Sequence, residues 1–163
     1  AERCYRQARE RLLAIGAVHA VYPVANLGQM LAQQGRWGEA REILESALSI
    51  FDRQGLAPMQ GTLHALLLAP VIAEGDGPAF DLHIKSARTL LDETRYVDPD
   101  IANMARLAGD VARERGQEQR ARRAYQLSAQ QLRALGREDE ARHVEMAFDL
   151  LEEYEPPVQA SWE

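Results

Sequence analysis

The chain has 163 residues, 46% hydrophobic and 27% charged, which is enough apolar material for one folded domain and excludes a disordered segment. Its net charge of -6 argues against a nucleic-acid binder, because phosphate contacts need a basic surface. The longest apolar run, from Ala65 to Ala73, is far shorter than the roughly 20 residues that span a bilayer. The single cysteine, Cys4, cannot form an internal disulfide, so we expect a cytoplasmic protein.

The first predicted helix covers residues 1–16. Cys4, Ala8 and Leu12 lie on one face of it, and Gly16 ends it. Because the helical pattern is present from the first residue, we expect this segment to be the second helix of a truncated helix pair in a longer protein. An apolar face without its partner would allow self-association through this end.

Residues 20–54 predict the most regular helix pair. Leu31 and Leu44 mark the apolar faces of its two helices, and Gly35 breaks the pattern between them in a left-handed turn. Small side chains indicate where the two helices approach closely, with Gly28 packed near Ala40. The small residues in this pair are Gly28, Ala40 and Ala47.

Residues 58–94 predict a second, looser pair. Gly75 follows Gly35 by 40 residues, and in that alignment Leu68 and Phe80 replace the small residues of the first pair. Pro70 lies inside the first helix of this pair, where it removes one backbone donor and should kink the helix. We therefore expect wider spacing between these two helices.

Residues 98–135 return to the regular pattern. Asp98 is a predicted N-cap, as is Asp76 in the preceding unit, and Pro99 takes the first helical position. Gly116 is the turn, and the close-approach residues are Gly109 and Ala121. A last helix over 138–154 has a polar face typical of the end of a helical array, and 155–163 form a tail.

The spacing of the first regular pair resembles the tetratricopeptide repeat (TPR). The residues that carry the resemblance are Asn26, Leu27, Gly28, Leu31, Gly35, Trp37, Ala40, Leu44 and Ala47. The resemblance implies an all-α fold, a right-handed superhelix of antiparallel helix pairs with about eight helices, in which 1–154 form a single α-α solenoid. It also implies a module that binds other proteins.

A second resemblance extends over residues 20–145. Its motifs are Gly75-Asp76, Phe80-Asp81-Leu82-His83, Asp98-Pro99-Asp100-Ile101-Ala102, Ala108-Gly109-Asp110 and Leu135-Gly136-Arg137. They look like the C-terminal helical arrays of large bacterial regulatory proteins that carry a serine/threonine protein kinase domain, often followed by an ATPase module. The resemblance implies the recognition or regulatory arm of a signalling protein. No kinase or ATPase motif lies in this chain, so no catalytic residue is implied.

In the repeat family the first helix of each unit lines a concave face that binds the partner. Carried over, those positions are Tyr22, Gln29, Gln33, Asn103, Arg106, Asp110 and Arg113, with an apolar middle of Ala65, Ala69, Ile72 and Ala73. Such a groove suits an extended or helical protein segment with an apolar anchor and an acidic residue, from another protein or from the same polypeptide. The alternative is that the charges on the third unit only neutralise one another along a solvated helix.

The alternative function is that of a small-molecule sensor. In that alternative the widened second unit, around Pro70, forms a ligand pocket between helices. His64 and His83 on the same unit, with Asp81 and Glu74 near them, match no metal motif. We expect bonded histidines there and neither a metal nor another cofactor.

Two charged stretches are further candidates for a functional site. Glu152, Glu153 and Glu155 are better explained as a solvated helix face than as a catalytic acid pair, because adjacent carboxylates point in different directions. A basic stretch forms either a docking patch or a surface neutralised by Glu114 and Glu118. Its residues are Arg113, Arg115, Arg120, Arg122 and Arg123. We expect a non-enzymatic chain.

Overall fold

A computed structural model describes residues 21–149, and these form seven α-helices with no strand among them. The helices are α2 (Val21–Gln33), α3 (Trp37–Gln54), α4 (Ala57–Ala73), α5 (Gly77–Thr94), α6 (Pro99–Glu114), α7 (Glu118–Ala134) and α8 (Glu138–Asp149). The predicted helix over 1–16, the end of the last helix with Glu152, Glu153 and Glu155, and the 155–163 tail lie outside the described residues. The self-association predicted for the N-terminal end depends on the same segment.

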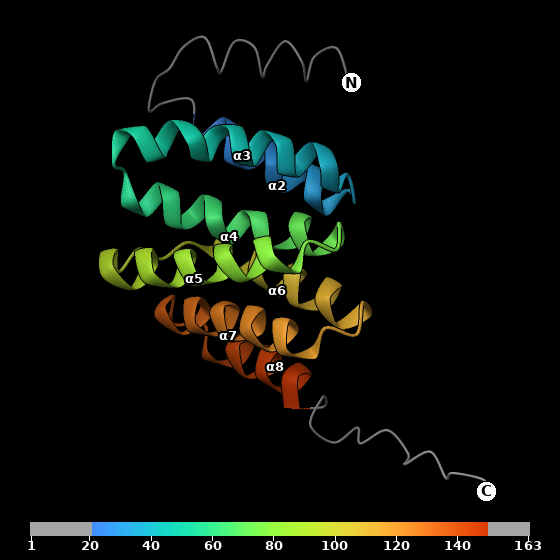
Figure 1. Ribbon diagram of the computed structural model, residues 1–163. Coiled ribbons are helices and arrows are strands. Elements are labelled where there is room, and N and C mark those ends of the chain that lie inside the picture. The colour runs from blue at the N-terminus through green and yellow to red at the C-terminus, as the bar shows by residue number, and fades with distance from the viewer. Residues whose placement is uncertain (1–20, 150–163) are drawn as a thin grey trace, which may run out of the picture.

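The helices of each pair pack against each other, α2 with α3, α4 with α5 and α6 with α7, and the array runs from α2 and α3 at the top of Figure 1 to α7 and α8 at the bottom. The all-α class and the pairing are therefore confirmed. The described residues hold seven helices where about eight were expected over the whole chain, and the remaining predicted helix falls in the residues that are not described. Each of the other predicted helices begins within a few residues of its expected position.

Local signals explain where the helices begin and end. The turns after α2 and α6 contain Gly35 and Gly116, with φ of 73° and 69°. This left-handed backbone conformation is strained for residues that have a Cβ atom, so glycine is favoured at both turns. The predicted caps are confirmed, because Asp76 accepts a hydrogen bond from the Ala79 N–H and Asp98 accepts one from the Asp100 N–H. These residues delimit α5 and α6.

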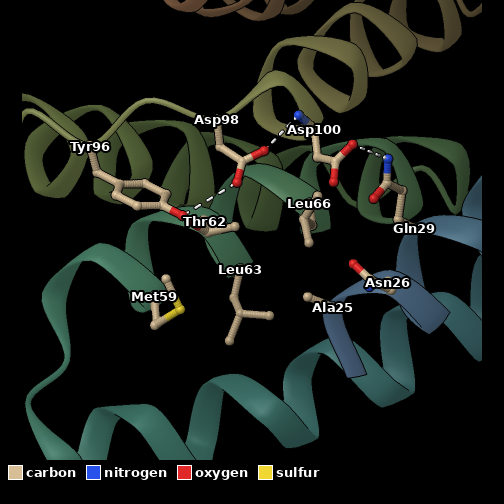
Figure 2. Close-up of a pocket in the computed structure, with 10 residues that line it drawn as sticks. All are labelled: Ala25, Asn26, Gln29, Met59, Thr62, Leu63, Leu66, Tyr96, Asp98 and Asp100. Atoms are coloured by element: carbon tan, nitrogen blue, oxygen red, sulfur yellow. Dashed lines mark hydrogen bonds between the residues drawn. The ribbon is translucent and has the colours of Figure 1, made fainter. Parts of the chain in front are cut away.

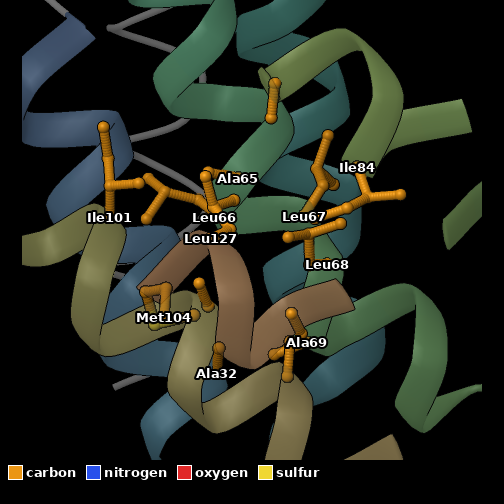
Figure 3. Close-up of a cluster of buried hydrophobic side chains, with 14 of the residues drawn as sticks. Ala32, Ala65, Leu66, Leu67, Leu68, Ala69, Ile84, Ile101, Met104 and Leu127 are labelled. Atoms are coloured by element: carbon orange, nitrogen blue, oxygen red, sulfur yellow. The ribbon is translucent and has the colours of Figure 1, made fainter. Parts of the chain in front are cut away.

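The helix α4 is the centre of the fold, because α2, α3, α5 and α6 all pack against it. Every residue from Ala65 to Ala73 is buried, including Pro70, and the helix continues through that proline. Figure 3 shows Leu66, Leu67 and Leu68 of α4 gathered with side chains from α2, α5, α6 and α7. A helix that is apolar on all sides is stable only when it is enclosed in this way.

Candidate binding site

The first helices of the three units, α2, α4 and α6, meet at one small pocket. The side-chain amide of Gln29 on α2 donates a 3.0 Å hydrogen bond to Oδ1 of Asp100 on α6, which links two helices far apart in the sequence. The helix α4 passes beside this link and provides Met59, Leu63 and Leu66 to the pocket wall (Figure 2). The first and third units are thus joined directly across the second.

The loop before α6 forms the remaining wall of the pocket. The chain leaves α5 at Arg95, a non-glycine residue with φ of 51°, and Tyr96 and Asp98 follow it. Asp98 accepts the Asp100 N–H at 2.8 Å through one carboxylate oxygen and the Tyr96 hydroxyl at 3.3 Å through the other. The capping carboxylate therefore also holds the aromatic ring at the pocket edge.

The pocket is small and amphipathic, with a volume of about 40 Å³. The partly buried Ala25 and Met59 supply its apolar surface, and the buried Leu63 and Leu66 lie beneath it; Figure 2 shows these side chains around the opening. Its polar lining residues are Asn26, Gln29, Thr62, Tyr96, Asp98 and Asp100. An apolar floor with a polar rim suits a single side chain that is anchored by burial and oriented by hydrogen bonds. We call this feature the α2–α4–α6 pocket.

The structure brings together only part of the predicted partner-binding set. Gln29 lies in the pocket, and Gln33 is exposed at the end of the same helix; the side chain of Tyr22 is outside the described part of the molecule. Asn103 and Arg106 are exposed on α6, opposite its buried side. Asn103 and Arg106, followed along α6 by Arg113, form an exposed polar stripe that begins one turn beyond Asp100.

Asp110 and Arg113 have structural neighbours. The Tyr125 hydroxyl donates a 2.7 Å hydrogen bond to Asp110, and the guanidinium of Arg113 lies 3.8 Å from the same carboxylate oxygen. Burial, followed by this carboxylate, raises the pKa of Tyr125, so the phenol stays protonated and continues to donate. Asp110 therefore positions Tyr125, while Arg113 remains exposed along the helix.

The predicted apolar middle of a groove is not present. Ala65, Ala69 and Ile72 have no exposed surface, and Ala73 is only 6% exposed. The reason is that α6 packs directly on α4 and covers the helix face that an open superhelix would leave free. The apolar residues around Pro70 are part of the same core, and the α2–α4–α6 pocket lies near the other end of α4.

The predicted close-approach residues are buried, and the two glycines among them lie against large side chains of the neighbouring helix. A Cβ atom on Gly28 would lie 2.5 Å from Cγ of Leu44, so Gly28 packs on the predicted partner helix α3 and accommodates a leucine one turn beyond Ala40. Gly109 likewise accommodates the ring of Tyr125. The other members of the set, Ala40, Ala47 and Ala121, are buried in the core. Glycine here provides space for a large side chain from the neighbouring helix.

The two histidines of the second unit bond to each other. Nδ1 of His64 and Nδ1 of His83 are 2.7 Å apart, whereas Glu74 and Asp81 pair with arginines of other helices. Within residues 21–149 no cluster of three or more His, Cys, Asp or Glu side chains could hold a metal ion. The expected bond between neighbouring helices is present.

The basic stretch on α6 and α7 is largely occupied by contacts to other helices. Arg120 donates to both carboxylate oxygens of Asp81 on α5, at 3.1 and 2.7 Å, and Arg123 donates to the same carboxylate. Arg115 donates to the backbone carbonyl of Ala73. The prediction of a neutralised surface holds for Arg120 and Arg123, but their acidic partner is on α5, not Glu114 or Glu118. Arg122 is half-buried.

Of the ten residues that line the pocket, only Gln29 was predicted from the sequence as a binding residue. The other nine are Ala25, Asn26, Met59, Thr62, Leu63, Leu66, Tyr96, Asp98 and Asp100. Asp98 was identified only as a helix cap. A usable signal was the Tyr-x-Asp-Pro-Asp string at the start of α6, which concentrates polar side chains where the loop enters the helix.

None of the helices in the described range has the length and apolar character needed to cross a bilayer. Comparisons with models of known protein families and with curated proteins found no match.

Proposed function

We propose that the chain is a non-enzymatic protein-binding module of the tetratricopeptide type, whose α2–α4–α6 side binds a segment of another protein or of its own longer polypeptide. The observation that carries this proposal is the α2–α4–α6 pocket, built from the first helix of three successive units and continued by an exposed polar stripe on α6. First helices provide the binding face in such repeats, which makes this side the natural docking surface.

The size of the pocket favours a protein segment over a metabolite. A volume of about 40 Å³ accommodates a few water molecules or a small side chain, whereas sites that enclose small ligands are typically on the order of 300 to 1,000 Å³. The partly buried Ala25 and Met59 would contact that side chain. One anchored side chain with flanking backbone contacts is a common mode of peptide recognition.

Charge gives the bound segment a preferred composition. The exposed stripe on α6 contains Arg106 and Arg113, and the Arg113 side chain is 45% exposed despite its neighbour Asp110. An acidic residue of the partner beyond its apolar anchor would meet these two guanidinium groups, which bind carboxylates well. The preferred segment therefore has an apolar residue followed by acidic ones.

We further propose that this module is the recognition or regulatory arm of a larger bacterial signalling protein. The support is the resemblance of residues 20–145 to the helical arrays of kinase-containing regulators. In such a protein the bound segment would come either from a substrate or from the kinase-containing chain itself.

Selection of short random peptides on the immobilised protein tests the binding site. We expect enriched peptides to carry an apolar residue near acidic ones, and to bind about tenfold more weakly to Ala25→Leu, which fills the pocket. The double variant Arg106→Glu, Arg113→Glu should weaken them similarly. Arg142→Glu, an equivalent charge reversal at an exposed position on α8, is the matched control.

The outcome is decided by comparing variants that remain folded by circular dichroism. If the selected peptides bind the pocket-filled and charge-reversed variants as tightly as the unmodified protein, the α2–α4–α6 side is not the docking surface. The half-buried and exposed residues around Arg122 would then be tested next by the same charge reversal.

A further inference from the structure

His64 on α4 and His83 on α5 face each other inside the second helix pair. Their Nδ1 atoms are 2.7 Å apart, and their rings, with centroids 5.0 Å apart, are tilted by 45°. His83 is buried and His64 is half-buried. Two ring nitrogens at this distance require one protonated Nδ1 that donates and one bare Nδ1 that accepts. At neutral pH the contact between α4 and α5 therefore contains one shared proton.

Charged groups from neighbouring elements act on both rings. Burial is the largest effect and lowers the pKa of each histidine, because the charged imidazolium loses its hydration. The carboxylate of Asp52 raises the pKa of His64 in part. At His83, the carboxylates of Glu45 and Asp76 raise the pKa, whereas the guanidinium of Arg41 lowers it further. These groups are Asp52, Glu45 and Arg41 on α3 and Asp76 at the start of α5.

The two rings bind additional protons in a defined order. Glu45 and Asp76 favour the charged form of His83, so the first added proton goes to that ring. Protonated His83 carries a hydrogen on both ring nitrogens, so its Nδ1–H donates to the bare Nδ1 of His64. Burial, followed by the charge on His83, lowers the pKa of His64 to about 4. The second proton must bind the accepting Nδ1 of His64, which removes the acceptor and leaves two cationic rings in contact.

We propose that the His64–His83 pair makes the packing of α4 on α5 a pH-sensitive joint, held by one shared proton near neutral pH and opened when both rings are protonated. The two helices form one of the most extensive interfaces of the fold, and α4 is also its central helix. Opening the joint therefore loosens the middle of the array. This inference does not depend on the proposed binding function.

The direction of the pH dependence follows from the lowered pKa values. In the unfolded chain each histidine binds a proton near its ordinary pKa of about 6.5, whereas in the folded protein His64 does so only near 4. The unfolded state thus binds more protons between these two values. Stability from the pair is complete above about pH 6.5 and is lost progressively as the pH falls toward 4.

The test compares melting temperatures from about pH 7 to about pH 5. The double variant His64→Gln, His83→Gln replaces the rings with amides that donate and accept but do not titrate. We expect its melting temperature to fall by several degrees less than that of the unmodified protein over this range. His143→Gln, which removes an exposed histidine on α8, should follow the unmodified protein.

A second measurement uses only the unmodified protein, so the proposal stays testable if the double variant does not fold. Hydrogen exchange, corrected for the intrinsic effect of pH, should show protection lost in α4 and α5 before it is lost in α7 as the pH falls toward about 4. The proposal would be overturned if melting temperature depended on pH equally in the double variant and the unmodified protein, or if exchange protection were lost uniformly over the helices. The proposal would also be overturned if Zn²⁺ at neutral pH raised the melting temperature of the unmodified protein but not that of the double variant, because the histidine pair would then be a metal site.

Discussion

The ring of Tyr125 lies directly against the backbone of Gly109, where a Cβ atom would be 2.5 Å from Cε1 of the ring. Gly28 and Leu44 have the same relation in the first unit, at the same sequence separation and the same 2.5 Å distance. In both units a large side chain of the second helix fills the space above a glycine of the first. The two regular units are therefore packed in the same register.

Gly109→Ala should destabilise the protein even though alanine favours helix by about 1 kcal/mol. The added methyl group needs the space of the Tyr125 ring, which is buried and held by its hydrogen bond to Asp110. We expect a net loss of about 1 to 3 kcal/mol in the free energy of unfolding, measured by urea titration. Gly38→Ala in α3 is the control, because its nearest neighbour is only the exposed carboxylate of Glu74. Equal effects at the two positions would contradict the packing.

Gln29→Ala should weaken the link between the first and third units. The amide donates to Asp100 at 3.0 Å in a partly buried position, and such a bond contributes about 0.5 to 1.5 kcal/mol. We expect a loss of that size in unfolding free energy, together with faster amide exchange in α2. Gln33→Ala changes an exposed glutamine one turn further along the same helix and should have no measurable effect. A Gln33 variant that loses as much stability would show that the link is not responsible.

Asp81→Asn should release two arginines of α7 at a small cost in stability. Arg120 and Arg123 both bond to this carboxylate, and they hold the pKa of Asp81 below its usual range. The side chains are 29 to 40% exposed, so solvent screens the interaction and the expected loss stays below about 1 kcal/mol. The difference should shrink further in high salt.

Asp139→Asn on α8 is the control for Asp81→Asn. Asp139 pairs with Arg142 at 2.7 Å, but its side chain is 85% exposed, so its removal should leave stability unchanged at any salt concentration. Unfolding titrations of both variants at low and high salt provide the test. A loss at Asp81 that does not respond to salt would assign its effect to packing at the contact between α5 and α7.

The elements that were predicted correctly depend on local chemistry. Gly35 and Gly116 form turns because a left-handed backbone is strained for other residues, and Asp98 begins α6 because its carboxylate satisfies a free backbone N–H. Such effects involve residues a few positions apart, so they are visible in the sequence. The histidine pair was also expected as a bond between neighbouring helices, although its 2.7 Å geometry was not.

The contacts between units were not predictable in the same way. The apolar stretch around Ala69 was expected to line a groove, but α6 covers it. Arg120 was expected either to form a docking patch or to pair along its own surface, but it reaches Asp81 on α5. Both outcomes depend on how the third unit is placed on the second, which short-range periodicity does not encode.

By itself, therefore, the sequence determined an all-α chain of paired helices, with its turns and caps, because backbone strain, hydrogen bonding and helical periodicity act over a few residues. The tertiary structure alone decided which faces stay open. Burial of α4 from every side removed the expected apolar groove, and the meeting of α2, α4 and α6 created the small pocket. Burial is a property of all the packed helices together, so it appears only when the units are assembled.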